Sequence, residues 1–219
     1  MKVRRAAQLI FSLAALAGAA SCLDVSGTGI ADAEIRMVNA SGQELGIYLD
    51  GQLAIDGSQQ LNISLITAAS GTHTLDVRTA AGIDTPLNLD LTPGGFTNTY
   101  AYTNSSGEVN LVLLDTTEVP APNMSKVRAI NLSRAAGAID IYASQPGSTP
   151  GTQLSPTFDY LASTPYSQRS AGSWEVYITT AGTTTKLLST GSFTLLPTER
   201  RTIVLIDSAS VPIFRALPN

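Results

Sequence analysis

The chain has 219 residues, of which 43% are hydrophobic and only 14% charged, and its formal net charge is −4. Ordinary globular chains carry about 25% charged residues, so this one is unusually neutral. Its scattered lysines and arginines form no basic stripe, which argues against nucleic acid and against an anionic membrane surface as partners. The single cysteine, Cys22, excludes an intrachain disulfide.

The N-terminus has the organisation of an export signal. Basic residues in the first five positions precede an apolar segment, 9–20, that is shorter than the ~20 residues needed to span a bilayer. Small residues then lead directly to Cys22, as in the lipobox of bacterial lipoproteins. We therefore predict a signal peptide over 1–21, a lipidated Cys22 and a flexible tether over 22–33. The alternative is an ordinary secretory signal with an incidental cysteine.

Beyond the tether, the chain consists of two similar halves. Segments of the first half return in the same order in the second, at spacings that grow along the chain, as expected if the second copy has longer loops. Such repetition predicts one small domain built twice. We expect these domains over 34–118 and 126–219, with a Pro-containing linker at 119–125. The matching segments are 35–41 and 127–133, 46–48 and 140–142, and 70–77 and 171–178.

Apolar and polar residues alternate along several short segments. Period two indicates antiparallel strands with one buried face and one face in water. Asp50-Gly51, between two apolar runs, predicts a tight hairpin. About seven short strands per half predict an all-β fold, with two tandem Ig-like or transthyretin-like antiparallel β-sandwiches. The alternating residues are Leu61, Ile63 and Leu65, then Leu87, Leu89 and Leu91, then Val109, Leu111 and Leu113.

His73 is the single histidine, and strand parity puts it on the inward face with Leu75 and Val77. Its counterpart in the second half is Trp174, so we expect it to fill space at the margin of a sheet. One histidine leaves no room for a His-based metal site. Calcium-loop, nucleophile-elbow and phosphate-loop motifs are also missing from the sequence. We therefore expect neither a metal nor a cofactor.

Carboxylates are the remaining route to catalysis. Asp76 is expected to point outward beside Arg78, with Asp90 outward on the next strand. Paired carboxylates catalyse glycoside hydrolysis. Aromatic platforms do not bracket these residues in the sequence, so we expect solvated strand residues.

Asn39 and Asn131 end the repeated strand motif, each within an Asn-x-Ser sequence. An asparagine at this place can fold its side chain onto the backbone of the following turn. We expect a structural role for both and no glycosylation.

The segment 144–170 outgrows its counterpart in the first half and contains four prolines. Loops that grow on a fixed scaffold often carry function, and aromatic rings beside arginine mark many interfaces. We expect a protein or glycan partner to contact this segment. The alternative is that two of its rings cover the edge of the sandwich. The candidate binding residues are Phe158, Tyr160, Tyr166 and Arg169.

The repeated phrase resembles the bacterial domain-of-unknown-function family 4397. Its members read approximately Val-Arg-Val-Val-His-Ala-Ser-Pro, followed by Val-Asp-Val-Tyr. Segments 35–41 and 127–133 match the first piece, with Asn39 and Asn131 where the family usually has His, and 139–142 matches the second. In the first half, Gly46 stands where the family has Asp. The resemblance covers both halves, implies anchored tandem β-sandwich modules of the cell envelope, and brings no catalytic residues.

Together these features predict a non-enzymatic, lipid-anchored cell-envelope protein that acts as a binding or spacer module. Cys22 would hold it at the outer membrane or cell surface. The alternative is a carboxylate-based glycosidase acting on envelope polysaccharide. A cleft with two facing carboxylates and aromatic walls would favour the enzyme, whereas smooth sandwiches with one exposed aromatic loop would favour the binder. The ligand and the oligomeric state stay open at this point.

Overall fold

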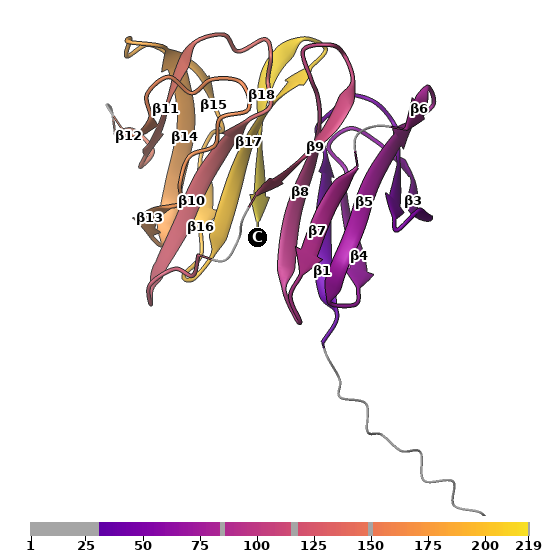
Figure 1. Ribbon diagram of the computed structural model, residues 1–219. Helices are drawn as coiled ribbons and strands as arrows, with labels where there is room; N and C mark the ends of the chain where they lie inside the picture. The colour runs from indigo at the N-terminus through magenta and orange to yellow at the C-terminus, as the bar shows by residue number, and fades with distance from the viewer. Residues whose placement is uncertain (1–30, 84–85, 115–117, 149–150, 219) are drawn as a thin grey trace, which may run out of the picture.

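The computed structural model describes residues 31–83, 86–114, 118–148 and 151–218, which contain eighteen β-strands and no helix (Figure 1). The predicted all-β class is therefore confirmed. The predicted signal peptide, Cys22 and most of the tether lie outside the described residues. None of the described segments is a helix with the length and apolarity to cross a bilayer.

The first half folds into a sandwich of two sheets. Its strands are β1 (Ala33–Asn39), β2 (Leu45–Leu49), β3 (Gln52–Ser58), β4 (Ile63–Ala68), β5 (Gly71–Thr79), β6 (Gly82–Ile83), β7 (Leu87–Leu91), β8 (Phe96–Thr103) and β9 (Val109–Leu114). One sheet has the order β4-β1-β8-β9, and the other has the order β3-β2-β5-β6, with β7 also paired to β5. The predicted antiparallel β-sandwich is therefore confirmed, with one parallel pair in it, β1 and β8.

The second half repeats this topology strand for strand. Its strands are β10 (Met124–Asn131), β11 (Ile139–Ser144), β12 (Thr152–Ser155), β13 (Ser167–Ser170), β14 (Gly172–Thr180), β15 (Lys186–Ser189), β16 (Phe193–Leu195), β17 (Arg200–Ser208) and β18 (Val211–Pro218). The sheets have the orders β13-β10-β17-β18 and β12-β11-β14-β15, with β16 also paired to β14. Strands β10 and β17 run parallel, as β1 and β8 do. The predicted domain limits stay a prediction, and β10 begins inside the expected linker.

Each sandwich has a hydrophobic core of its own. In the repeated phrase, Ile35 and Met37 on β1 and Val127 and Ala129 on β10 lie at these two cores. The first core also contains Leu45, Ile47, Leu75, Val77, Leu89 and Leu91. The second contains Ile139, Ile141, Phe158, Val176, Ile178, Ile203 and Leu205.

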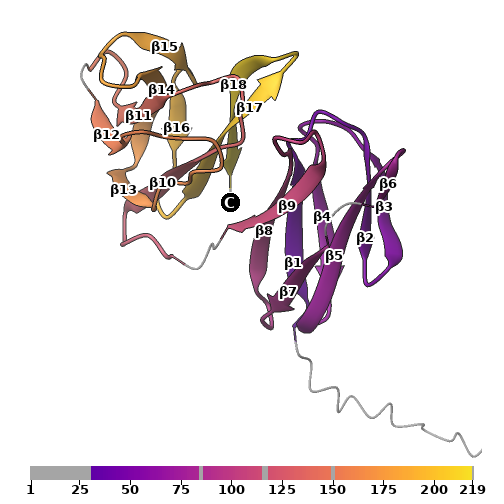
Figure 2. The same ribbon diagram turned by 45° about the horizontal axis from the view of Figure 1, so that its top comes forward.

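A third apolar cluster joins the two sandwiches. The sheets β4-β1-β8-β9 and β13-β10-β17-β18, here called the inner sheets, face each other in the middle of the molecule (Figures 1 and 2). The inner sheets are therefore covered on both faces, and residues 202–206 of β17 are buried without interruption. We expected each sheet to have one face in water. This holds for the outer sheets, β3-β2-β5-β6 and β12-β11-β14-β15, and fails for the inner sheets. The cluster comprises Val38, Ala40, Tyr100, Leu114, Ile130, Leu132, Val204, Ile206 and Leu217.

Equivalent positions of the two halves make reciprocal contacts across this cluster. The Gln60 side chain donates to the carbonyl oxygen of Asp207 at 2.8 Å. Tyr160, at the position equivalent to Gln60, donates its hydroxyl to the carbonyl oxygen of Thr103 at 2.5 Å. Thr103 and Asp207 in turn occupy equivalent places near the ends of β8 and β17. Reciprocity of this kind defines an isologous, two-fold contact, formed here within one chain.

Strand β4 departs from the predicted pattern. Its core residues are Ile66 and Ala68, whereas Ile63 and Leu65 are 45% and 59% exposed. The register pairs Ile63 with Val38 and therefore places it on the face toward the second sandwich. Because β4 is an edge strand, the other sandwich covers that face incompletely. The prediction that residues 61, 63 and 65 face the core is thus wrong. Leu89 and Leu91 on β7 are buried, as predicted.

Candidate functional site

Two hollows lie side by side at one end of the first sandwich, at the top in Figure 1 near β6. The outer hollow has a volume of about 460 Å³ and the tip hollow about 280 Å³. Thr79 lines both, so the β5–β6 hairpin separates them. The outer hollow is lined by Glu44, Leu45, Gly46, Tyr48, Asp56, Gly57, Arg78, Thr79 and Ala80. The tip hollow is lined by Gln43, Thr79, Ala81, Gly82, Gly107, Glu108 and Val109.

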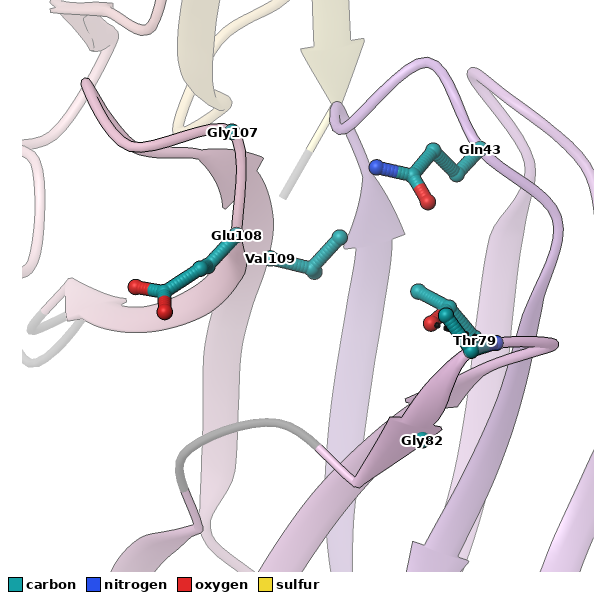
Figure 3. A pocket seen from close by; sticks show the side chains of 7 residues that line it. Gln43, Thr79, Gly82, Gly107, Glu108 and Val109 are labelled. Carbon is teal, nitrogen blue, oxygen red and sulfur yellow. Dashed lines mark hydrogen bonds between the residues drawn. The ribbon is translucent and has the colours of Figure 1, made fainter.

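The tip hollow is formed by three loops that meet at the end of the sandwich (Figure 3). Gln43, from the β1–β2 loop, extends its amide over this space, and Val109 points toward it from the start of β9. The Glu108 carboxylate points the other way, and Glu108 accepts a hydrogen bond from Asn104 at 3.0 Å. The polar side chains of the tip hollow are therefore Gln43 and Thr79.

Tyr48 and Arg78 form one wall of the outer hollow, and Asp76 supports them from behind. The Arg78 guanidinium carbon lies 3.6 Å from the centre of the Tyr48 ring, a cation–π contact. Arg78 Nε also lies 3.2 Å from Asp76 Oδ2. Asp76 is only 7% exposed, because Arg78 and Tyr48 flank it on the outer face of the sheet. The expectation of a solvated Asp76 is therefore corrected, although its place beside Arg78 is as predicted.

A β-bulge places Asp56 and Gly57 at the hollow. Leu45 pairs with Ser58 and Ile47 with Ile55, so two residues of β3 stand opposite the single residue Gly46 of β2. Gly57 has a φ of +66°, which glycine adopts without strain. Bulges of this type bend a strand and redirect its side chains, and this one turns Asp56 toward the rim.

Gly46 forms the floor of the outer hollow, where any side chain would intrude. A Cβ atom added there would lie 3.1 Å from Tyr48 Cε2. The equivalent residue of the second sandwich is Asp140, which is 5% exposed. Its carboxylate accepts hydrogen bonds from the backbone amides of Thr157 and Gly182, both at 2.9 Å. The second sandwich thus places a carboxylate at this position, whereas in the first the Tyr48 ring lies beside Gly46 and the hollow opens next to it.

The structure also defines the counterparts of Thr157 and Gly182. Ser58 and Phe158 occupy equivalent places, because their carbonyl oxygens accept from Asn39 and Asn131 at 2.7 and 2.8 Å. Gly57 is therefore the counterpart of Thr157, and both have positive φ angles.

The second equivalence follows from the strands β5 and β14, which end at Thr79 and Thr180. Ala81 is therefore the counterpart of Gly182. Gly46, Gly57 and Ala81 all line the two hollows.

The rim of the outer hollow is acidic and accessible. Glu44 and Asp56 are both exposed, and Glu44 accepts a hydrogen bond from Gln59 Nε2 at 2.5 Å. The other oxygen of Glu44 approaches Gly57, 3.2 Å from where a Cβ would stand. Arg78 and Thr79 add hydrogen-bond donors, so the lining combines donors with acceptors.

Phe158 is a core residue and not a surface ring. It is fully buried in the second hydrophobic core, and its amide donates to the Ile139 carbonyl oxygen at 2.6 Å. The expectation that it anchors a partner is therefore corrected: the longer connection between β12 and β13 inserts this ring between the sheets.

The other three residues predicted for binding are also engaged within the chain. Burial of the Tyr160 hydroxyl against the first sandwich raises the pKa of Tyr160 to about 12. The Arg128 guanidinium carbon lies 4.4 Å from the centre of the Tyr166 ring. Arg169 lies over Trp174 at 5.3 Å, and desolvation lowers the pKa of Arg169. These contacts give the three residues packing roles, and their part in partner binding stays a prediction.

The two repeated asparagines make the turn contacts expected from the sequence, whereas the hydrogen bonds of His73 were not predicted. His73 Nδ1 lies 2.7 Å from Asp50 Oδ2, and its Nε2 lies 2.9 Å from the Ala69 carbonyl oxygen. Trp174 makes the equivalent contact to Ser170 at 2.9 Å. Asn39 and Asn131 each accept a hydrogen bond from the amide two residues ahead, at 3.0 and 2.9 Å.

The comparisons with known proteins identify a family but no activity. The family described as "Domain of unknown function (DUF4397)" matches residues 33–142, half of the chain. Among solved structures, one described as "Alpha-glucan binding by a streptococcal virulence factor" aligns with 83% of this chain and 96% of its own. The identity is 11% and the TM-score 0.26. No curated protein sequence matches the chain.

Proposed function

Because this chain belongs to the DUF4397 family, a family without an assigned function, we propose a function from the site itself: a non-catalytic binding module of the cell envelope. The outer hollow of the first sandwich is the proposed ligand site. The observation that carries the proposal is the contrast between Gly46 and Asp140. The second sandwich folds with an aspartate at this position, so the fold itself does not require the hollow beside Gly46 in the first sandwich.

The shape and surroundings of the hollow support binding. Its volume of about 460 Å³ lies within the range of ~300–1,000 Å³ usual for ligand sites. The contacts of Arg78 with Tyr48 and Asp76 hold one wall in place before a ligand arrives, which reduces the conformational entropy lost on binding.

The position of the hollow also suits an anchored protein. Strand β1 enters the first sandwich at the end opposite the hollows (Figure 1). We propose that Cys22 is lipidated and holds the chain at the outer membrane or cell surface. The hollow would then face away from the membrane. Replacing Cys22 with Ala is expected to move the protein from the membrane to the soluble fraction, and an unchanged detergent partition would contradict the anchor.

A glycosidase is the weaker alternative, although Glu44 and Asp56 both line the hollow. Such enzymes keep one carboxylic acid protonated by burying it, and both of these side chains are exposed. We therefore propose binding without hydrolysis.

The test is a ligand screen by thermal shift, with envelope extract fractions and defined sugars, on the wild type and on Gly46→Asp. Ligands of the hollow should stabilise the wild type and leave the variant unchanged, with no products released. If every stabilising ligand acts equally on both proteins, the hollow is not the site.

A further inference from the structure

The filled site of the second sandwich indicates which chemical group the open site accepts. Asp140 presents two carboxylate oxygens to the amides of Thr157 and Gly182. The counterparts of these amides belong to Gly57 and Ala81, which line the outer and tip hollows. In the first sandwich, Gly46 supplies no carboxylate to the two equivalent segments of backbone, so a ligand oxygen could take that role.

The Ala81 amide has only a long hydrogen bond in its present surroundings. It reaches the Thr79 hydroxyl at 3.3 Å, beyond the usual range of about 2.7–3.2 Å for N–H···O contacts. Thr79 lies between the two hollows, so its hydroxyl can rotate toward a ligand. An oxygen atom placed above Gly46 would offer Ala81 a better acceptor.

The rim determines what carries that oxygen. Glu44 and Asp56 accept hydrogen bonds but do not donate them when ionised. A ligand carboxylate would accept from the backbone amides, yet it would meet two like charges at the rim. A hydroxyl accepts from an amide and donates to Glu44 at the same time, so it satisfies both sides of the site.

We propose that the outer hollow binds a neutral, hydroxyl-rich sugar, one hydroxyl of which takes the place of the Asp140 carboxylate. This inference rests on the proposed function and specifies its ligand class. The adjoining tip hollow, with the Gln43 amide and Thr79 at its border, receives the next sugar unit. Both hollows together therefore suit an oligosaccharide better than a single sugar.

The test compares three β-1,4-linked tetrasaccharides of equal length by titration calorimetry on the full-length protein. They are the neutral N-acetylglucosamine tetramer, the cationic glucosamine tetramer and the anionic mannuronic acid tetramer. We expect the neutral tetramer to bind at least about 10-fold more tightly than the anionic one, the factor that corresponds to ~1.4 kcal/mol, and more tightly than its own monomer. Preference for either charged tetramer, or equal binding of monomer and tetramer, would overturn the inference.

The Gly46→Asp substitution separates this inference from the proposed function. Because its Cβ would lie 3.1 Å from Tyr48 Cε2, the Tyr48 ring must shift in this variant. The variant should lose at least about 10-fold in affinity for the neutral tetramer and keep a cooperative thermal unfolding transition. The matched control is Asp90→Asn, at an exposed position of the neighbouring strand β7, and it should bind as the wild type does.

Two outcomes would contradict the inference. If no tetramer binds, but another ligand from the screen binds the wild type and not Gly46→Asp, the sugar inference fails and the proposed function survives. If the neutral tetramer binds Gly46→Asp as tightly as the wild type, the inference also fails.

Discussion

Single side chains set the local chemistry of each sandwich, and His73 is the clearest titrating example. Its hydrogen bond to Asp50 raises the pKa of His73 above the ordinary 6.5, and the Thr74 amide and His73 together lower the pKa of Asp50. The raised pKa of His73 means that the folded state binds its proton more tightly than the unfolded state does. The stability from this pair is therefore complete between the ordinary pKa of Asp50, 3.8, and pH 6.5. It is lost as the pH rises through the folded-state pKa of His73, and also as the pH falls through the lowered pKa of Asp50.

Replacing Asp50 with Asn is expected to bring the pKa of His73 back toward its ordinary value, because the main cause of the upward shift is removed. Since His73 is the single histidine, an NMR titration of its ring protons reads this pKa without overlap. The exchange of Asp90 for Asn, on an exposed position of β7, is the control. Equal His73 pKa values in wild type and Asp50→Asn would show that the pair does not persist in solution.

Asp140 is the second residue-scale case, since its buried carboxylate satisfies two backbone amides. The Asp140→Ala variant is expected to lose about 2 kcal/mol in free energy of unfolding, because hydrogen bonds to a charged group are lost and both amides become orphaned. Urea unfolding measures this loss, and Asp90→Ala serves as the control. A loss no larger than that of the control would argue against a structural role for the carboxylate.

At the scale of elements, local signals in the sequence were the most predictive. Asp50 and Gly51 form the expected hairpin, with φ angles of +51° and +77°. The signal for the hollow was also visible, because Gly46 interrupts a motif that Asp140 completes. The face of β4 was not predictable, since period two reveals which residues share a face and not which face meets the core. The burial of Phe158 was equally hidden, because loop sequence does not show where a loop folds back.

The reciprocal contacts of Gln60 and Tyr160 lead to a prediction about the elements that carry them. Tyr160→Phe removes the hydroxyl that donates to Thr103, and Gln60→Ala removes the donor to Asp207. Each is expected to lower the free energy of unfolding by about 1 kcal/mol. The double variant should lose the sum of both, because the contacts do not share a partner. Urea unfolding with no loss in either variant would contradict a stabilising role for these contacts.

At the scale of the whole molecule, the inner sheets make the two sandwiches one packed unit. The sequence predicted separate domains because it shows a repeat and a linker, while the contact between copies depends on three-dimensional placement. An isolated first sandwich would expose an apolar face that the second sandwich now covers. This face comprises Val38, Tyr100, Val112 and Leu114. A fragment of residues 33–118 is therefore expected to self-associate through this face. Sedimentation that shows a stable monomer at high concentration would contradict this expectation.

The central claim is that a ligand oxygen occupies, in the first sandwich, the place of the Asp140 carboxylate in the second. The most direct measurement is a ¹⁵N–¹H NMR titration of the protein with the neutral N-acetylglucosamine tetramer. We predict that the amide signals of Gly57 and Ala81 shift downfield on binding, because both amides gain an acceptor, while those of Thr157 and Gly182 stay in place. Unchanged Gly57 and Ala81 signals at saturation, or shifts confined to the second sandwich, would contradict the claim.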